Sequence, residues 1–530
     1  MTAVVTRKHT SHGRRHPATV IARQCPRALP KQSRVLRLLR LRLDRILAMT
    51  MSFIASTSPG LPSRSDGGGM TVGLAKGPTV QAVIVLAFIL LLRHAAWAEE
   101  LPALPQGPLI LTSVTQEQLS PDYWIERLPE PDKPIKTREE LQRFNEEIHS
   151  MVRERVDIFK LPVQRAGKPI RELLEFEYTT LRGRILFGAD NKRIESSFFE
   201  TTIKPTVQWN KVPDQIDLKW GAATRSTSVR ALPSMVKMLE EVGDVEFDQL
   251  QFTLVKLWTP VAVLHESSDG KWFYVQVPYV RGWVLAKDIA IFPSREALRK
   301  AVKLGDFLVV TGDHIPIFLD SGFKNLWLEE SMGSVIPLAG KSDTAYEIWM
   351  PLRRSDGRVA LRRSYVKMGS DVSSGFPPFT QANMIRQAFK LLGARYGWGG
   401  MYEGRDCSGF IHDVFLSLGV DMPRDSEQQA FVGTQLGHFE PFESAVAKER
   451  ALRWSAPGFT LLRMPLHLML YLGEVNGRFY VIHSTWAERV SMTSDEKVRI
   501  NQVVVSDLSL NGRSYLGSLF ERVISVNEVN

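Results

Sequence analysis

Residues 405–410 read Arg-Asp-Cys-Ser-Gly-Phe and place Cys407 at the expected start of a helix. Apolar side chains then recur at helical spacing, at Phe410, Val414, Phe415 and Leu418, and Gly419 is a typical stop. The unpaired amides of a helix N-terminus lower the pKa of a thiol, so this position favours the thiolate. Cysteine statistics alone favour a buried structural thiol, and the surroundings of Cys407 must decide between the two interpretations.

The positive charge of the 530-residue chain is concentrated in its first hundred residues. Residues 1–98 carry fifteen Lys or Arg against Asp44 and Asp66, which amounts to +13. Subtracting 13 from the formal charge of +10 leaves about −3 for residues 99–530. The body of the protein is therefore not basic, and we expect no nucleic-acid partner. At about 100 to 200 residues per domain, the chain is long enough for three or four domains.

The same first hundred residues are typical of targeting. The apolar run at 82–92 is shorter than the ~20 residues that cross a bilayer, and it ends in Ala96-Trp97-Ala98. We therefore expect a signal peptide at 70–98 and a basic extension at 1–69, which is either disordered or a start assigned too early. The mature protein would be exported to the periplasm or the cell wall, without a stable membrane span.

Signal cleavage would also isolate the thiol. The chain has two cysteines, and cleavage before Glu99 removes Cys25. Cys407 would then have no disulfide partner within an exported chain. A lone thiol in an oxidising compartment favours a chemical role.

Residues 99–225 predict a helical N-terminal stabilising segment. Thr137 and Glu140 form a capping box, which is followed by an apolar stripe at Leu141, Phe144, Ile148, Met151 and Val152. Such a stripe is typical of core packing. We find no catalytic constellation here and expect the segment to brace the domains that follow.

Two small all-β barrels are expected next, at 226–298 and 299–372. Short strands alternate with Gly and Asp turns, as at Ser268-Asp269-Gly270 before the aromatic strand 272–275. We expect most barrel aromatics to lie in the core and the others to line a peptide-binding groove.

Residues 379–530 contain the candidate chemistry. The run from Leu466 to Gly473 alternates like a strand, Asn476-Gly477 makes a turn, and the chain returns to His483. A helix thus carries Cys407 while a hairpin carries His467 and His483. A helix-borne thiol, a histidine on the facing sheet and a third polar group that orients the imidazole form the papain-like arrangement. The expected fold class is α+β.

The register of this hairpin leaves one alternative open. A strict two-residue turn at Asn476-Gly477 would place His483 opposite Leu470, on the face away from His467. A bulge or a three-residue loop would restore a shared face.

Four stretches together resemble the NlpC/p60-type cell-wall cysteine peptidases. They are Arg405–Phe410, the Tyr396-Gly397-Trp398-Gly399-Gly400 run, Pro423-Arg424-Asp425-Ser426 and His467–Gly473. Gly282-Trp283-Val284 resembles bacterial Src-homology-3-like (SH3b) barrels. The whole order of helical segment, two barrels and peptidase domain is similar to exported family members that trim peptidoglycan stem peptides, so the resemblance covers most of residues 99–530.

This resemblance implies a role for seven residues. Cys407 would be the nucleophile, His467 the general base and later acid, and His483 the residue that orients His467. Tyr396 would help backbone N–H groups at Cys407 to stabilise the oxyanion. The substrate's free N-terminal alanine and its D-glutamate would be held by Asp406, Ser408 and Ser426.

The resemblance also implies a substrate. In that family the bond cut is the γ-amide between D-glutamate and diaminopimelate or lysine. The first barrel closes one end of the cleft, which selects stem peptides with a free N-terminal L-Ala. Neither a metal nor an organic cofactor is expected.

Several of these residues also have structural interpretations. His467 on an apolar strand is compatible with a core histidine, Ser426 with a capping box to Gln429, and Tyr396 with packing near the glycine run. We expect His412 and His438 to be structural or surface residues and Trp398 to lie in the core.

Two functions of different class stay open at this point. One is a cysteine endopeptidase, and the other is a non-catalytic cell-wall binding protein that retains the fold. The joint presence of Cys407, His467 and His483 favours the first. A peptidoglycan amidase or acyltransferase on the same fold is a variant, because the triad does not choose the acyl donor.

Overall fold

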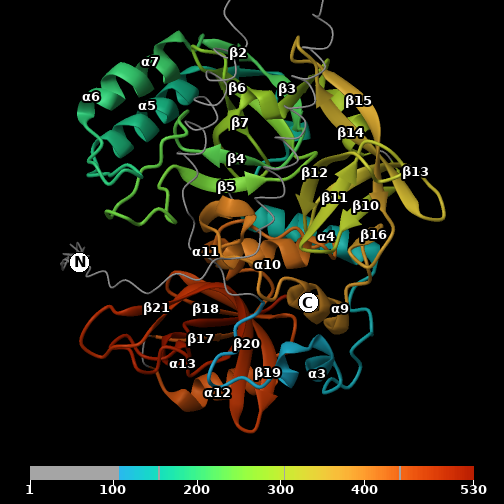
Figure 1. Ribbon diagram of the computed structural model, residues 1–530, viewed down its shortest axis with the longest axis vertical. Helices are drawn as coiled ribbons and strands as arrows, with labels where there is room; N and C mark the ends of the chain where they lie inside the picture. Colours follow the sequence, from blue (N-terminus) through green and yellow to red (C-terminus); the bar gives the residue numbers. More distant parts are fainter. Residues whose placement is uncertain (1–106, 153–154, 304, 441–442) are drawn as a thin grey trace, which may run out of the picture. The chain divides into compact units, whose positions relative to one another are not determined.

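The structure is a computed structural model that describes residues 107–152, 155–303, 305–440 and 443–530. The expected extension at 1–69, the expected signal peptide at 70–98 and Cys25 lie outside the described residues. Helices and antiparallel sheets both contribute, which confirms the α+β class (Figure 1). Within the described ranges, no helix is both long and apolar enough to cross a bilayer.

The N-terminal segment contains the predicted capped helix, α4 (Arg138–Met151). The Glu140 backbone N–H donates to Thr137 Oγ1 at 3.2 Å, and the Thr137 N–H donates to Glu140 Oε2 at 2.7 Å. The other elements of this segment are η1 (Glu117–Leu119), α3 (Pro121–Ile125), η2 (Ile158–Lys160), β1 (Gln164–Ala166), α5 (Lys168–Arg182), α6 (Ser196–Phe198), η3 (Phe199–Ile203), α7 (Lys204–Val207), η4 (Trp209–Lys211) and β2 (Gln215–Asp217).

This segment divides between two hydrophobic cores. The buried side chains of α3 and α4 belong to the core of the C-terminal domain, whereas those of α5 belong to a core shared with the two β-domains. Met151, expected in the α4 stripe, is 54% exposed because the helix ends there. Asn145 fastens α4 through hydrogen bonds of 2.8 Å to the Gly419 carbonyl and the Asp421 N–H. The part with α3 and α4 therefore packs on the C-terminal domain, and the part with α5 packs on the two β-domains.

The first β-domain (219–292) is a seven-stranded antiparallel sheet with the order β5-β4-β8-β7-β6-β3-β9. Its strands are β3 (Lys219–Ala223), β4 (Thr227–Arg230), β5 (Gln251–Val255), β6 (Pro260–Glu266), β7 (Trp272–Gln276), β8 (Arg281–Leu285) and β9 (Ile289–Phe292), with η5 (Ala286–Asp288) before β9. β3 precedes the expected boundary at 226 yet pairs with both β6 and β9. Tyr274 and Trp283 are fully buried, as core aromatics were expected to be.

The second β-domain (307–374) is also a seven-stranded antiparallel sheet, with the order β12-β11-β15-β14-β13-β10-β16. α8 (Arg295–Val302) leads into it. Its strands are β10 (Phe307–Val310), β11 (His314–Phe318), β12 (Leu326–Ser331), β13 (Val335–Lys341), β14 (Ala345–Arg353), β15 (Val359–Lys367) and β16 (Val372–Ser374).

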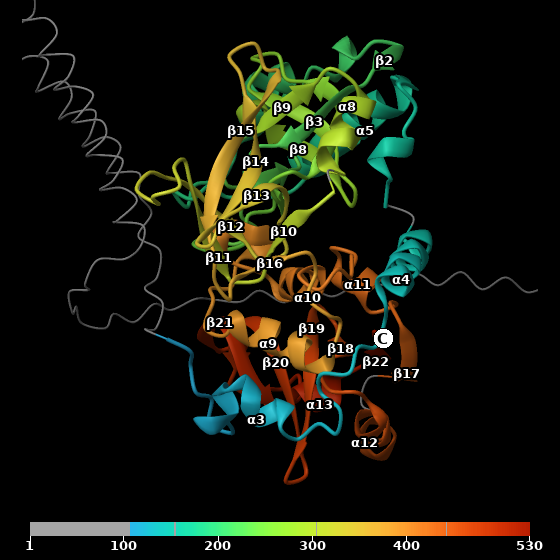
Figure 2. The same ribbon diagram turned by 90° about the vertical axis from the view of Figure 1, so that its right-hand side faces the viewer.

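The C-terminal domain packs helices on a six-stranded antiparallel sheet, ordered β17-β22-β18-β19-β20-β21. α9 and α10 share one core with the sheet, and α12 and α13 share another (Figure 2). The elements are α9 (Gln381–Lys390), η6 (Trp398–Glu403), α10 (Cys407–Leu416), α11 (Ser426–Gln429), β17 (Thr434–His438), α12 (Ala445–Trp454), β18 (Thr460–Met464), β19 (His467–Val475), β20 (Arg478–Arg489), β21 (Lys497–Asp507), α13 (Leu519–Arg522) and β22 (Ser525–Glu528).

A junction cluster of charges joins this domain to both β-domains. It consists of the buried Arg405 and Asp413 and the partly buried Lys256 and Asp313. Asp413 of α10 accepts hydrogen bonds from Arg405 Nε at 2.7 Å and from Lys256 Nζ at 2.9 Å. Arg405 Nη1 also donates to Asp313 at 2.6 Å. Burial opposes the charge of Asp413, but Lys256 and other cationic neighbours outweigh it and hold the pKa of that carboxyl well below its usual value.

We expect Asp413→Asn to lower the free energy of unfolding by about 3 to 5 kcal/mol, because it leaves Arg405 and Lys256 buried without their shared anion. Denaturant unfolding of the purified protein measures the change. Asp132→Asn is the matched control, since it removes an exposed ion pair with Arg386 and should cost less than about 1 kcal/mol. Equal effects of the two substitutions would contradict the structural role of the cluster.

Candidate active site

Cys407 is the first residue of α10, as the sequence predicts. Asp406 is the N-cap residue, and its carboxylate accepts the Gly409 backbone N–H at 2.6 Å. The Cys407 side chain is half-buried and forms no disulfide within the described residues. The backbone N–H of Leu468, the residue after His467, donates toward the sulfur. The thiol therefore lies against the start of β19.

The expected thiolate is not the resting state of this cysteine. Burial, and after it the nearby Asp406 carboxylate, raise the pKa of the Cys407 thiol to about 12. The N–H groups of Leu468 and Ser408 act in the opposite direction but do not outweigh burial. The prediction from the helix N-terminus was wrong because it ignored desolvation.

The hairpin of β19 and β20 contains a bulge, which is one of the two registers that the sequence allowed. Asn476 and Gly477 adopt φ of 51° and 75°, which suits a two-residue turn between the strands. The register shifts between Tyr471 and Gly473, and beyond the shift Leu470 pairs with Ile482. His483 therefore falls opposite Met469 and shares a face with His467.

The two histidines are in direct contact. His467 Nε2 lies 2.7 Å from His483 Nδ1, and His483 Nε2 lies 3.0 Å from Ser506 Oγ on β21. Burial, followed by the Arg522 charge, lowers the pKa of His467 to about 4. Burial and His467 also hold the pKa of His483 well below its usual value. Both rings are thus neutral near pH 7, and the three side chains form one hydrogen-bonded chain.

Tyr396 lies close to the thiol and the N-cap. Burial, then the Asp406 and Cys407 charges, raise the pKa of Tyr396 well above its usual value, so its hydroxyl stays protonated. Its backbone N–H donates to the Asn501 carbonyl at 3.0 Å. Its ring centroid lies 6.2 Å from that of Phe247 in the first β-domain.

Asp406 and Ser408 belong to one hydrogen-bond network with Arg424. Arg424 donates to Asp406 Oδ2 at 2.6 Å and to Ser408 Oγ at 2.8 Å. Asp406 also accepts the Ser408 hydroxyl and the backbone N–H groups of Gly399 and Gly409. Its carboxylate therefore has four partners within the protein. The sequence motif at 423–426 contained Arg424, but no role was predicted for it.

Ser426 stands apart from this network. It is the first residue of α11, and the N-cap is Asp425, which accepts the N–H groups of Glu427 and Gln428. The alternative capping box between Ser426 and Gln429 was therefore wrong. Gln429 instead donates to the carbonyls of Ser408 and Pro423, at 3.0 and 2.6 Å, which links α11 to α10.

The first β-domain contributes a carboxylate and an aromatic ring beside Tyr396. Glu246 is 4% exposed and accepts hydrogen bonds from Arg395 Nη2 at 2.8 Å, Asn501 Nδ2 at 3.0 Å and Trp486 Nε1 at 2.7 Å. Phe247 contacts the rings of Trp398 and Trp486, with centroids 5.6 and 5.2 Å apart. Trp398 is 37% exposed rather than core, since it packs at a domain junction.

Ser506, Arg424 and Glu246 were missed by the sequence reasoning. Ser506 is a polar residue directly after the apolar run 503–505, and this interruption was a usable signal. Glu246 lies in another domain and gave none. Among the other histidines, His412 is buried and bonds to Asp413 at 3.2 Å, whereas His438 is exposed on β17, which agrees with the structural and surface roles expected of them.

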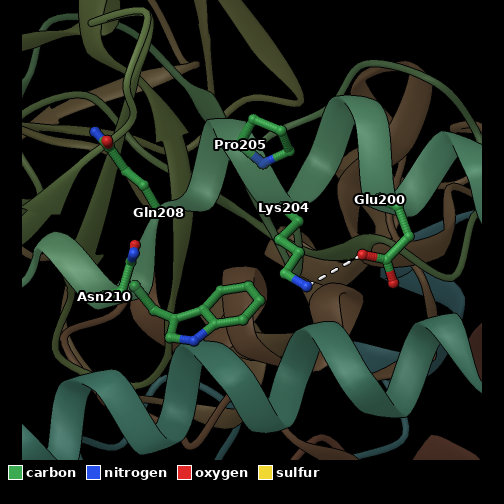
Figure 3. Close-up of a pocket in the computed structure, with 6 residues that line it drawn as sticks. Glu200, Lys204, Pro205, Gln208 and Asn210 are labelled. Carbon is green, nitrogen blue, oxygen red and sulfur yellow. Dashed lines mark hydrogen bonds and ion pairs between the residues drawn. The ribbon is translucent and has the colours of Figure 1, made fainter.

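A pocket on the N-terminal segment contains none of the predicted site residues (Figure 3). It is lined by Glu200, Lys204, Pro205, Gln208, Trp209 and Asn210, and Lys204 Nζ pairs with Glu200 at 3.1 Å. In the described part of the chain, no group of three or more His, Cys, Asp or Glu side chains is arranged to hold a metal ion.

Comparison with known families agrees with this geometry. The sequence model of the NlpC/P60 family matches residues 393–508, which include α10 and the hairpin of β19 and β20. The chain carries an NlpC/P60 domain. An SH3 domain of the SH3b1 type matches residues 238–285, within the first β-domain.

Two curated relatives share this NlpC/P60 similarity at low identity. A gamma-D-glutamyl-L-lysine dipeptidyl-peptidase of Bacillus cereus (strain ATCC 10987 / NRS 248) is 28% identical over 193 residues, which is 34% of this chain and 51% of the relative. A protein of the same name from Bacillus subtilis (strain 168) is 28% identical over 118 residues, 22% of this chain and 36% of the relative. The chain thus spans about half the length of the first relative and about a third of the second.

A solved structure has a similar fold over 80% of this chain. It is that of a novel NlpC/P60 endopeptidase from Photobacterium damselae subsp. piscicida, with a TM-score of 0.63 at 18% identity over 80% of this chain and 99% of the other. Residues 393–508 are thus similar to the NlpC/P60 family and residues 238–285 to SH3 domains of the SH3b1 type, and the curated relatives with this similarity are peptidases.

We expect the alkylation of Cys407 by iodoacetamide to accelerate about tenfold per pH unit between pH 6 and 9, because the pKa of the thiol is about 12 and the thiolate fraction grows tenfold per unit below it. Mass spectrometry of the peptide containing Cys407 measures the rate. A rate that stays flat from pH 5 to 8 would instead indicate a preformed thiolate–imidazolium pair.

We expect His483→Ala to reduce kcat/KM by about 10²-fold and His483→Asn to retain most of it, since the Asn amide oxygen lies close to the position of Nδ1 that contacts His467. Steady-state kinetics with a cleaved peptide measure both variants. Equal losses in the two variants would show that the hydrogen bond to His467 is not what His483 supplies.

Proposed function

We propose that the protein is an exported cysteine endopeptidase that hydrolyses the γ-amide between D-glutamate and diaminopimelate, or lysine, in peptidoglycan stem peptides. The observation that carries this proposal is the hydrogen-bonded series of side chains His467, His483 and Ser506. His467 directly precedes Leu468, whose backbone N–H faces the Cys407 sulfur. The names of the two Bacillus relatives support the γ-D-glutamyl bond. Export is supported by the apolar run at 82–92 and the Ala-Trp-Ala motif after it.

In the proposed mechanism His467 acts first as a base. Of the two proton arrangements that fit the histidine chain, one has His467 Nε2–H donating to His483 Nδ1 and His483 Nε2–H donating to Ser506. This arrangement leaves His467 Nδ1 free to accept the Cys407 proton as the sulfur attacks the carbonyl carbon. His467 then protonates the leaving amine, and water hydrolyses the acyl-enzyme.

Tyr396 is proposed to stabilise the tetrahedral intermediate. Its hydroxyl remains protonated because burial raises its pKa, so it is available as a donor to the oxyanion. The backbone N–H of Cys407 at the start of α10 is proposed as the second donor. Ser408 and Ser426 are proposed to contact the D-glutamate.

Selection of a free N-terminal L-Ala is proposed to depend on the Asp406–Arg424 pair. The sequence predicts an ammonium contact for Asp406, but this carboxylate already accepts four hydrogen bonds. A substrate ammonium group would therefore have to share or displace Arg424. The packing of Phe247 and Glu246 against the Tyr396 region supports a site that is closed at the amino end.

The test is incubation of the purified protein with L-Ala-γ-D-Glu-diaminopimelate and with its N-acylated form, followed by mass spectrometry. We expect L-Ala-D-Glu from the free peptide only, and a loss of at least about 10³-fold in Cys407→Ala. His438→Ala, at an exposed position on β17, is the control and should retain full activity.

Each alternative function has its own outcome in this test. Product formation that survives Cys407→Ala rejects the thiol mechanism, and equal cleavage of the N-acylated peptide rejects the closed amino end. Release of muramoyl sugar from whole muropeptides, without γ-bond cleavage, identifies an amidase. Binding without any product identifies a non-catalytic wall-binding protein.

A further inference from the structure

Arg522 is a cationic side chain at the His467 end of the catalytic hairpin. It is the last residue of α13, and two residues later the Ile524 N–H donates to the Arg463 carbonyl at 2.8 Å. Arg463 is followed by Met464, which pairs with His467 across β18 and β19. These backbone contacts hold the end of α13 close to His467, the first residue of β19.

No carboxylate in the described ranges forms an ion pair with the guanidinium of Arg522. Its Nη1 is fully buried without a hydrogen-bond partner, and among the described residues no ion pair involves this side chain. The neighbouring carboxylates have other partners. Glu521 accepts the N–H and hydroxyl of Ser518, and Asp495 pairs with Arg489 and Lys497. A buried guanidinium nitrogen without a hydrogen-bond acceptor destabilises the folded protein unless a ligand supplies the acceptor.

The charged groups that face Arg522 do not provide this acceptor. They are Arg489, Tyr515 and His467, of which none is a carboxylate. Burial and Arg489 lower the pKa of Arg522, and Arg522 in turn lowers the pKa of His467. An imidazole that must become cationic during catalysis therefore lies next to a fixed cation. A bound anion would relieve both problems.

We propose that Arg522 binds a carboxylate of the substrate beside the scissile bond. This inference rests on the proposed function. A γ-linked stem peptide offers two such groups, the α-carboxylate of D-glutamate and the additional carboxylate of diaminopimelate. Both present the planar acceptor pair that a guanidinium binds in charge-assisted hydrogen bonds. Occupancy would cancel the Arg522 charge near His467 and favour proton transfer from Cys407 in the substrate complex.

The test compares three peptides in the wild type, Arg522→Gln and the matched control Arg463→Gln. The peptides are L-Ala-γ-D-Glu-diaminopimelate, its D-isoglutamine analogue without the α-carboxylate, and the lysine analogue without the additional carboxylate. We expect the wild type to disfavour one analogue by about tenfold or more in kcat/KM, and Arg522→Gln to lose that preference. The analogue concerned identifies the bound carboxylate. Arg463 is ion-paired with Glu427 at 3.0 Å, so its replacement should leave the preference unchanged.

A preference that persists in Arg522→Gln, or that is equally lost in Arg463→Gln, overturns the proposal. Arg522→Lys keeps the charge and should keep part of the preference, which covers the case in which Arg522→Gln does not fold. If the wild type cleaves none of the peptides, the proposed function fails and a substrate-free readout decides the inference. That readout is the alkylation rate of Cys407 by iodoacetate relative to iodoacetamide. A ratio about tenfold lower in Arg522→Gln than in the wild type supports the carboxylate site, and an unchanged ratio rejects it.

Discussion

Arg405 is 4% exposed, and its guanidinium is held between Asp413 of α10 and Asp313 of the second β-domain. A buried cation is tolerated only when anions surround it, so these contacts constrain the chain closely. The Arg405 carbonyl is also bound by the Ser484 hydroxyl at 2.6 Å. Because Cys407 is two residues away, the same contacts fix where the thiol meets the sheet. Lys256 of the first β-domain completes the cluster, so the position of Cys407 depends on three domains.

Burial also keeps Cys407 and His467 uncharged in the free protein. The pKa of Cys407 is raised to about 12 and that of His467 is lowered to about 4, so the free protein holds a thiol and a neutral imidazole. In the proposed mechanism a thiolate–imidazolium pair must therefore form during the reaction. Preorganised hydrogen-bond donors around the thiol would reduce the free-energy cost of forming this ion pair, and so would an anion bound to Arg522. Neutrality at rest also limits reaction of the thiol with oxidants, which attack the thiolate.

Local spacing was enough to predict the elements that carry the candidate site. Helical periodicity placed the start of α10 at Cys407, and the Asn476-Gly477 turn placed the hairpin. The sequence did not predict whether His467 and His483 lie on the same face of the sheet. A one-residue bulge moves the side chains that follow it to the other face, and the alternation of apolar and polar residues does not reveal such a bulge. The thiolate expectation failed since desolvation depends on what packs over the helix. Arg424 and Glu246 act through partners distant in sequence, which no local pattern reveals.

The SH3b-containing domain is a part of the site rather than an appendage to it. Glu246 bonds to the side chain of Asn501, whose carbonyl accepts the Tyr396 N–H, and it also bonds to Arg395, the residue before Tyr396. One carboxylate of the first β-domain therefore holds both segments that position Tyr396. Glu246, Asp313 and Arg522 all lie outside the matched range 393–508. The matched range contains Cys407, His467 and His483, but residues beyond its limits contribute to their geometry and charge, so relatives that share only this range are free to differ in the peptides they accept.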